Sequence, residues 1–65
     1  MTEKVLKRIR LERFTSGFSQ EFVANKLNIS QSFYARIESG KNRLTVDFLI
    51  KLAEIFEIQP EDFFK

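Results

Sequence analysis

The 65-residue sequence contains no cysteine, histidine or tryptophan, one proline and two glycines. Without cysteine and histidine it cannot form a disulfide, the usual zinc-finger ligand sets, or a Ser-His or Cys-His pair for nucleophilic catalysis. Its apolar runs are far shorter than the roughly 18 residues that cross a bilayer, and residues 1–4 lack the apolar core of a signal peptide. We therefore expect a cytoplasmic domain with no metal, no cofactor, no membrane contact and no enzymatic activity.

The length of the chain limits its architecture. We expect a single domain over residues 1–65, because a chain this short has one small hydrophobic core. Such a domain buries only about 60% of the surface that its unfolded chain exposes. We expect its free energy of unfolding to be small, roughly 3–5 kcal/mol.

The charges are distributed unevenly along the chain. Residues 1–43 contain nine Lys and Arg against four acids, a formal charge of +5, whereas residues 44–65 contain two against five, a charge of −3. A basic first part and an acidic last part suggest one surface for a polyanion and another that avoids it. The alternative is a solvated surface whose charges have segregated without a function.

Apolar residues recur at helical spacing and predict an all-α fold. Three hydroxyl residues precede apolar-periodic segments and are expected N-caps, namely Ser19, Ser30 and Thr45. Asn28 and Gly40 follow segments of this kind and are expected to adopt the left-handed conformation that ends a helix. The sequence therefore predicts five short helices, at about residues 2–14, 20–27, 31–39, 46–56 and 60–64, with a break at residues 15–17.

The segment 19–40 contains two helices of eight to nine residues joined by a turn of three or four, which is typical of a helix-turn-helix. The residues of this segment that agree with one known pattern in a single register are Ser19, Gln20, Ala24, Leu27, Ile29, Ser30, Ile37, Glu38 and Gly40. With them the segment resembles the Xre/Cro family of bacterial and phage repressors, whose pattern reads roughly S-Q-x-x-L-A-x-x-L-G-I-S-x-x-x-I-S-x-I-E-x-G. Asn28 stands in place of the usual turn glycine of that pattern. Residues 52–56 also resemble the fourth helix of the family.

This resemblance implies a sequence-specific transcription regulator that binds a double-stranded DNA operator. In a helix-turn-helix the second helix lies in the major groove, with its N-terminal residues at the base edges. Helical spacing places residues 31, 32, 35 and 36 on one face, with Tyr34 and Ile37 toward the core. The expected base-reading residues are Gln31, Ser32, Ala35 and Arg36, although Gln31 could simply be solvated and Ser32 could be a second capping hydroxyl.

Two further groups are expected to bind phosphates, which position a protein without reading sequence. The start of the helix expected at residues 20–27 offers free amides and a favourable dipole, and the resemblance assigns a role there to Ser19 and Gln20. Residues at the end of the helix that would enter the major groove (the recognition helix), and in the loop after it, would bind phosphates on the other side of that helix. The alternative is that they only keep the loop soluble. They are Ser39, Lys41, Asn42 and Arg43.

The family pairs an arginine of its first helix with the glutamate that precedes the final glycine. Here the resemblance favours Arg10 as the partner of Glu38, because Leu6 and Ile9 fall in register with it, whereas counting back from Ser19 selects Arg13. Phe33 falls on the flank of the recognition helix. It either touches a thymine methyl or sugar at the groove edge or, as we favour, packs against Phe18 or Phe22.

The C-terminal segment contains more apolar residues than one small core can bury. Exposed apolar surface of this kind marks interfaces. We therefore expect a homodimer whose subunits contact each other through Phe56, Ile58, Phe63 and Phe64. This dimer would bind a pseudo-palindromic operator. Such a regulator would occupy a promoter or contact RNA polymerase. The alternative is a protein-interaction module that uses the Phe-rich surface, with weak or absent DNA binding.

Overall fold

The computed structural model describes residues 3–65, and these residues form helices and connecting turns without a strand. The elements are α1 (Glu3–Ser16), α2 (Gln20–Lys26), α3 (Gln31–Glu38), α4 (Val46–Phe56) and the 3-10 helix η1 (Pro60–Phe64). The predicted all-α fold is confirmed. The predicted fifth helix is a 3-10 segment, and the predicted break comes later because α1 continues to Ser16. Residue 2, the expected first helical residue, lies outside the described residues.

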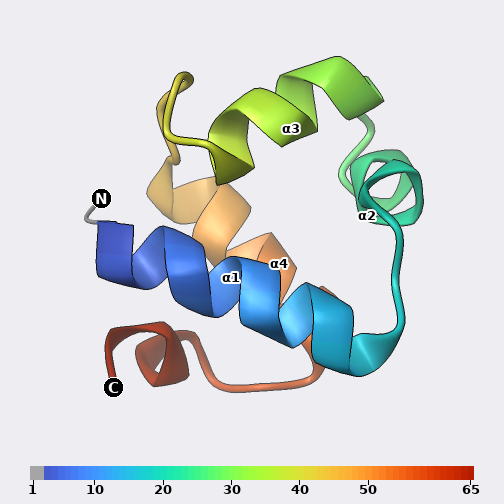
Figure 1. Cartoon of the computed structure of the whole chain (residues 1–65). Helices are drawn as coiled ribbons and strands as arrows, with labels where there is room; N and C mark the ends of the chain where they lie inside the picture. The colour runs from blue at the N-terminus through green and yellow to red at the C-terminus, as the bar shows by residue number, and fades with distance from the viewer. Residues whose placement is uncertain (1–2) are drawn as a thin grey trace.

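The helices pack around α1, which crosses the front of the molecule in Figure 1 with α4 behind it. Helix α3 lies above α1, α2 packs against α3, and η1 returns below α1. The described part of the chain measures 28 × 23 × 19 Å along its principal axes. Among these residues no helix has both the length and the apolar character needed to cross a membrane.

Three helices begin at the predicted hydroxyl caps. The side-chain oxygen of each cap accepts a hydrogen bond from the third backbone N–H of its helix, at 3.0 Å for Ser19, 3.1 Å for Ser30 and 3.2 Å for Thr45. Each bond satisfies an amide that has no partner inside the helix. These local interactions fix where α2, α3 and α4 start.

The same three helices end at residues in the left-handed backbone conformation. Asn28 has a φ of 60° and Gly40 a φ of 85°, which confirms both predictions. At Gly40 a β-carbon would also lie only 3.3 Å from a methyl carbon of Leu6, so α1 passes close to this turn. Glu57 ends α4 with a φ of 58°. This helix end could not be predicted from the residue type, because Glu rarely adopts the left-handed conformation.

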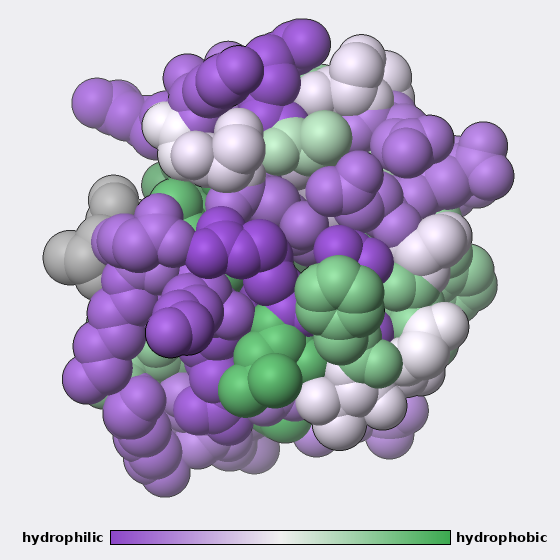
Figure 2. Space-filling model, in the orientation of Figure 1, coloured by the Kyte–Doolittle hydropathy of each residue, from purple (hydrophilic) through white to green (hydrophobic). Residues whose placement is uncertain are grey.

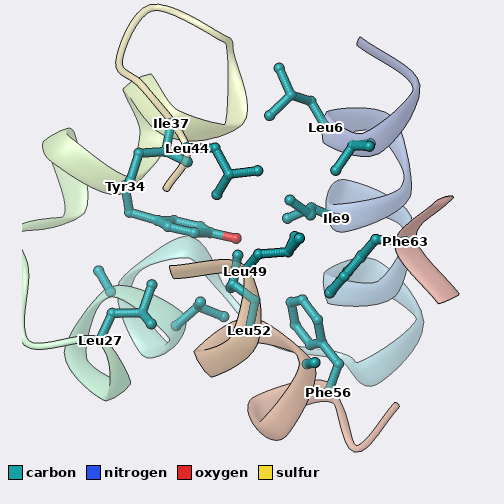
Figure 3. Packing of buried hydrophobic residues seen from close by; sticks show 14 residues of the cluster. Leu6, Ile9, Leu27, Tyr34, Ile37, Leu44, Leu49, Leu52, Phe56 and Phe63 are labelled. Carbon is teal, nitrogen blue, oxygen red and sulfur yellow. The ribbon is translucent and has the colours of Figure 1, made fainter. Parts of the chain in front are cut away.

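All five elements contribute to one core, and Figure 3 shows its side chains converging between α1, α3 and α4. Tyr34 extends from α3 into the middle of this core, and Phe63 returns from η1 to pack near Phe56. Both Tyr34 and Phe63 are completely buried. The buried apolar residues are Val5, Leu6, Ile9, Val23, Ala24, Leu27, Tyr34, Ile37, Leu44, Leu49, Leu52, Ala53, Phe56 and Phe63.

Candidate nucleic-acid interface

Helix α3 has one buried side and one open side. Tyr34 and Ile37 are completely buried, as their spacing predicts. On the open side, Gln31, Ser32 and Arg36 are exposed and Ala35 is half-buried. The hydroxyl of Ser32 lies 3.4 Å from that of the capping Ser30, so it has a weak local partner. The four predicted base-reading residues thus share an outward face of a helix whose other side is fixed in the core.

A buried polar cluster centred on Glu38 holds α3 in place. Arg13 of α1 donates to the two carboxylate oxygens of Glu38 at 2.7 and 3.3 Å, the Tyr34 hydroxyl donates at 2.6 Å, and the Gln20 amide donates at 3.1 Å. Arg13 also donates to the backbone carbonyl of Phe18 at 3.1 Å. One carboxylate therefore connects α1, α2 and α3.

This environment shifts the pKa values of the cluster. Burial alone would raise the pKa of Glu38, but the hydrogen bonds from Arg13, Tyr34 and Gln20 outweigh it and hold that pKa below its ordinary value. The hydrogen bond to Glu38 raises the pKa of Arg13. Burial, followed by the contact with the Glu38 carboxylate, raises the pKa of Tyr34. At neutral pH the cluster is an arginine–glutamate ion pair with a neutral tyrosine.

The prediction that Arg10 forms this ion pair is wrong. Arg13 lies four residues after Ile9 and continues the buried side of α1, whereas Arg10 lies at its edge and is half-buried. Arg10 instead donates to the backbone carbonyl of Glu38 and pairs with the Glu3 carboxylate. The roles of Tyr34 and Gln20 in the cluster were not predicted, although the i, i+4 spacing of Tyr34 and Glu38 is a signal that could have indicated the role of Tyr34.

The start of α2 presents the two residues expected at phosphates. Ser19 is exposed, and its oxygen accepts from the Phe22 amide, which leaves the hydroxyl hydrogen available to a ligand. Gln20 is half-buried, and its side-chain amide is directed to Glu38. The position of this amide is therefore fixed by the same cluster that anchors α3.

The loop after α3 is tied to the last turn of that helix. The backbone carbonyl of Arg36 accepts hydrogen bonds from the Ser39 hydroxyl at 3.2 Å and from the amides of Lys41 and Asn42 at 2.9 and 3.1 Å. Lys41 and Arg43 are exposed, and Asn42 is half-buried. The structure thus brings the expected phosphate residues of the loop next to the end of α3.

Comparison with protein families agrees with this geometry. The sequence model described as helix-turn-helix matches residues 6–63, nearly the whole chain. The chain belongs to the Xre/Cro family of helix-turn-helix proteins. Searches of the curated proteins and of the solved structures gave no significant match. Membership in the Xre/Cro family makes the chain a DNA-binding regulator in the general sense.

The aromatic packing partner predicted for Phe33 in this Xre/Cro protein is wrong. Phe33 packs, but its aromatic neighbour is Phe48 of α4, with ring centroids 6.4 Å apart, and not Phe18 or Phe22. The Phe18 ring lies instead against Phe22 at 4.5 Å and Phe56 at 6.4 Å. The reason is that Phe33 lies on the side of α3 that faces α4.

Only part of the dimer surface predicted at the C-terminal end is exposed in the structure. Phe56 and Phe63 are buried within the single chain, because η1 folds back under α1 and fills the end of the core. They cannot contact a second subunit across an exposed surface. Of the predicted set, Ile58 is half-buried and Phe64 is 53% exposed. Only these two are left for an interface at the C-terminal end.

Proposed function

We propose that this Xre/Cro-family protein is a sequence-specific double-stranded DNA-binding transcription regulator that inserts α3 into the major groove. The observation that carries the proposal is the outward face of α3, where Gln31, Ser32 and Arg36 are exposed. The opposite side of the same helix is fixed by the buried Glu38 ion pair. A rigid helix with a polar outer face suits the reading of base edges, because misplaced side chains lose bidentate geometry.

Each of the four proposed base-reading residues has a matching chemistry. The Arg36 guanidinium can donate two hydrogen bonds to guanine, and the Gln31 amide can pair with adenine, each pairing giving about 1–3 kcal/mol of discrimination. Ser32 can donate or accept, and the methyl group of Ala35 suits the thymine methyl. The proposed operator half-site therefore contains guanine and adenine within the few base pairs that α3 covers.

Phosphate contacts on both sides of α3 would orient the protein on the duplex. Ser19 and Gln20 lie at the N-terminal end of α2, where the helix dipole favours an anion. The exposed cations Lys41 and Arg43, with Ser39 and Asn42, follow α3 directly. We assign these six residues to the DNA backbone, which supplies affinity without sequence preference.

The proposed working unit is a homodimer on a pseudo-palindromic operator, with Phe64 and Ile58 at the subunit contact. Two recognition helices would then be separated by one helical turn of DNA, roughly 34 Å. Bound at a promoter, the dimer would regulate by blocking access or by touching RNA polymerase. Because its ligand is duplex DNA, its proposed place of action is the nucleoid, in the cytoplasm. It would act by binding alone, without catalysis.

The proposal is tested by selecting duplexes from a random-sequence pool and measuring fluorescence anisotropy of the enriched duplex at several salt concentrations. We expect enrichment of one sequence and a log–log salt slope near −0.9 for each phosphate contact. A duplex with the enriched bases scrambled should bind orders of magnitude more weakly. If no duplex is enriched, or if binding is insensitive to salt, the DNA-reading function is wrong for this chain.

A further inference from the structure

The outward side of α1 carries a stripe that the proposed DNA contacts do not use. Lys4, Lys7, Leu11 and Phe14 follow one another at spacings of three, four and three residues, which places them on one face of the helix. All four are exposed, and Leu11 and Phe14 are 57% and 69% exposed. Figure 2, which views the molecule from the side of α1, shows a small hydrophobic patch surrounded by hydrophilic residues.

Phe14, one of the two apolar residues of the stripe, has a cationic partner on the same helix. The Arg13 guanidinium lies 4.6 Å from the centre of the Phe14 ring, a distance suited to a cation–π contact. Arg13 is itself fixed by the buried ion pair with Glu38. Phe14 is therefore presented to solvent by a rigid support, as is typical of aromatic residues that anchor protein interfaces.

The basic half of the stripe has no carboxylate partner among the residues that the structure describes. Arg8, Arg10 and Arg13 on the same helix are all paired with carboxylates. Within residues 3–65, no carboxylate lies within 4 Å of Lys4 or Lys7. Both lysines lie in the first turns of α1, where the positive end of the helix dipole adds to their potential. The surface thus favours an anionic partner beside an apolar contact.

We propose that this stripe, Lys4, Lys7, Leu11 and Phe14, is a docking surface for an acidic amphipathic segment of another protein. Carboxylates of the partner would pair with the two lysines, and its apolar side chains would cover Leu11 and Phe14. A second copy of the chain would bring a stripe of the same positive charge and so would not neutralise the two lysines, and two apolar side chains are too few for a stable lipid-inserted face. Helix α1 packs on α3 and α4 through its opposite side, so the partner can bind while α3 contacts DNA.

The experiment selects partners for the full chain from a displayed library of random 12-residue peptides. Enriched peptides are then titrated by fluorescence anisotropy against wild type, Leu11→Ser, Phe14→Ser and Lys7→Glu. Ile50→Ser is the matched control, because Ile50 is a 45% exposed hydrophobic residue on α4. Circular dichroism verifies that each variant is folded, and duplex binding by Leu11→Ser shows that the DNA surface is intact.

We expect peptides rich in Asp and Glu with interspersed Leu, Ile or Phe. Their affinity should fall roughly tenfold or more on each of the three stripe variants and stay unchanged on Ile50→Ser. The proposal is overturned if no acidic peptide is enriched or if binding is equal on all variants. It is also overturned if Leu11→Ser abolishes self-association in sedimentation velocity, or abolishes binding to vesicles of equal parts phosphatidylcholine and phosphatidylglycerol, since the occupant would then be a second copy or a lipid surface.

Discussion

Glu38 stabilises the helix-turn-helix through a charge that is almost completely removed from water, with only 2% of the residue exposed. A buried ion pair adds little net stability compared with an apolar pair, but removal of one partner leaves the other charge buried and unpaired. Arg13, Tyr34 and Gln20 all donate to this carboxylate. The cluster therefore specifies how α1, α2 and α3 are oriented relative to one another.

The two arginines near Glu38 should differ strongly on substitution. Arg13→Ala is expected to lower the free energy of unfolding by about 3–5 kcal/mol, enough to unfold much of a domain this small. Arg10→Ala is expected to cost about 1 kcal/mol or less, because its ion pair with Glu3 is exposed to solvent. Urea denaturation followed by circular dichroism measures both. An equal loss, or a larger one for Arg10→Ala, would contradict the assignment.

The lowered pKa of Glu38 predicts the direction of the pH dependence. A carboxyl whose pKa is lower in the folded than in the unfolded state contributes stability that is complete above the unfolded pKa, about 4.3, and is lost as the pH falls through the folded value. NMR titration of the Glu38 side-chain carboxyl carbon should give a pKa below the ordinary value of a glutamate. A titration midpoint at or above this value would mean that burial outweighs the hydrogen bonds.

At the scale of the elements, the helix boundaries depend on single residues at their ends. Glu57 closes α4 in the left-handed conformation, which costs a non-glycine residue about 1–2 kcal/mol. Glu57→Gly is therefore expected to raise the free energy of unfolding by about 1 kcal/mol. Glu54→Gly, an exposed position inside α4, should lower it by about 1 kcal/mol. Urea denaturation of the two variants tests the assignment, and a destabilised Glu57→Gly would refute it.

Most elements could be predicted because their signals are local. A hydroxyl at Ser19, Ser30 or Thr45 bonds an amide three residues away, so the neighbouring sequence contains the whole interaction. Asn28 and Gly40 are likewise among the few residues that tolerate a positive φ. The four predicted base-reading residues share the outward face of α3 for the same reason, since helical periodicity alone places them there.

The remaining features depend on contacts between distant residues. Whether Arg10 or Arg13 reaches Glu38 is decided by the rotation of α1 against α3, which places Arg13 on the buried side of α1 and Arg10 at its edge. The burial of Phe63 depends on the return of η1, where the backbone carbonyl of Asp62 accepts a hydrogen bond from Arg8, 54 residues earlier. The sequence pattern indicates that the C-terminal segment has more apolar residues than one small core buries. It does not indicate whether these residues are covered by the same chain or by a second subunit.

In the whole molecule, a substitution in the proposed subunit contact should weaken dimer formation without weakening the contact of one subunit with DNA. If the C-terminal end forms the dimer, Phe64→Ser should shift the protein toward monomer in sedimentation velocity at tens of micromolar. Phe64 is exposed in the single chain, so the variant should remain folded. Affinity for a single half-site should be unchanged, and affinity for the full operator should fall. A wild type that is monomeric at this concentration would refute the dimer.

Base reading by α3 and phosphate binding by its flanking residues are distinguished by comparing Arg36→Ala with Lys41→Ala on the selected duplex and its point variants. We predict that Arg36→Ala loses about 1–3 kcal/mol of discrimination at one base pair. Lys41→Ala should weaken binding to all sequences alike and reduce the salt slope by about one. If Arg36→Ala keeps the full sequence preference, or if Lys41→Ala changes that preference, α3 does not read the operator as proposed.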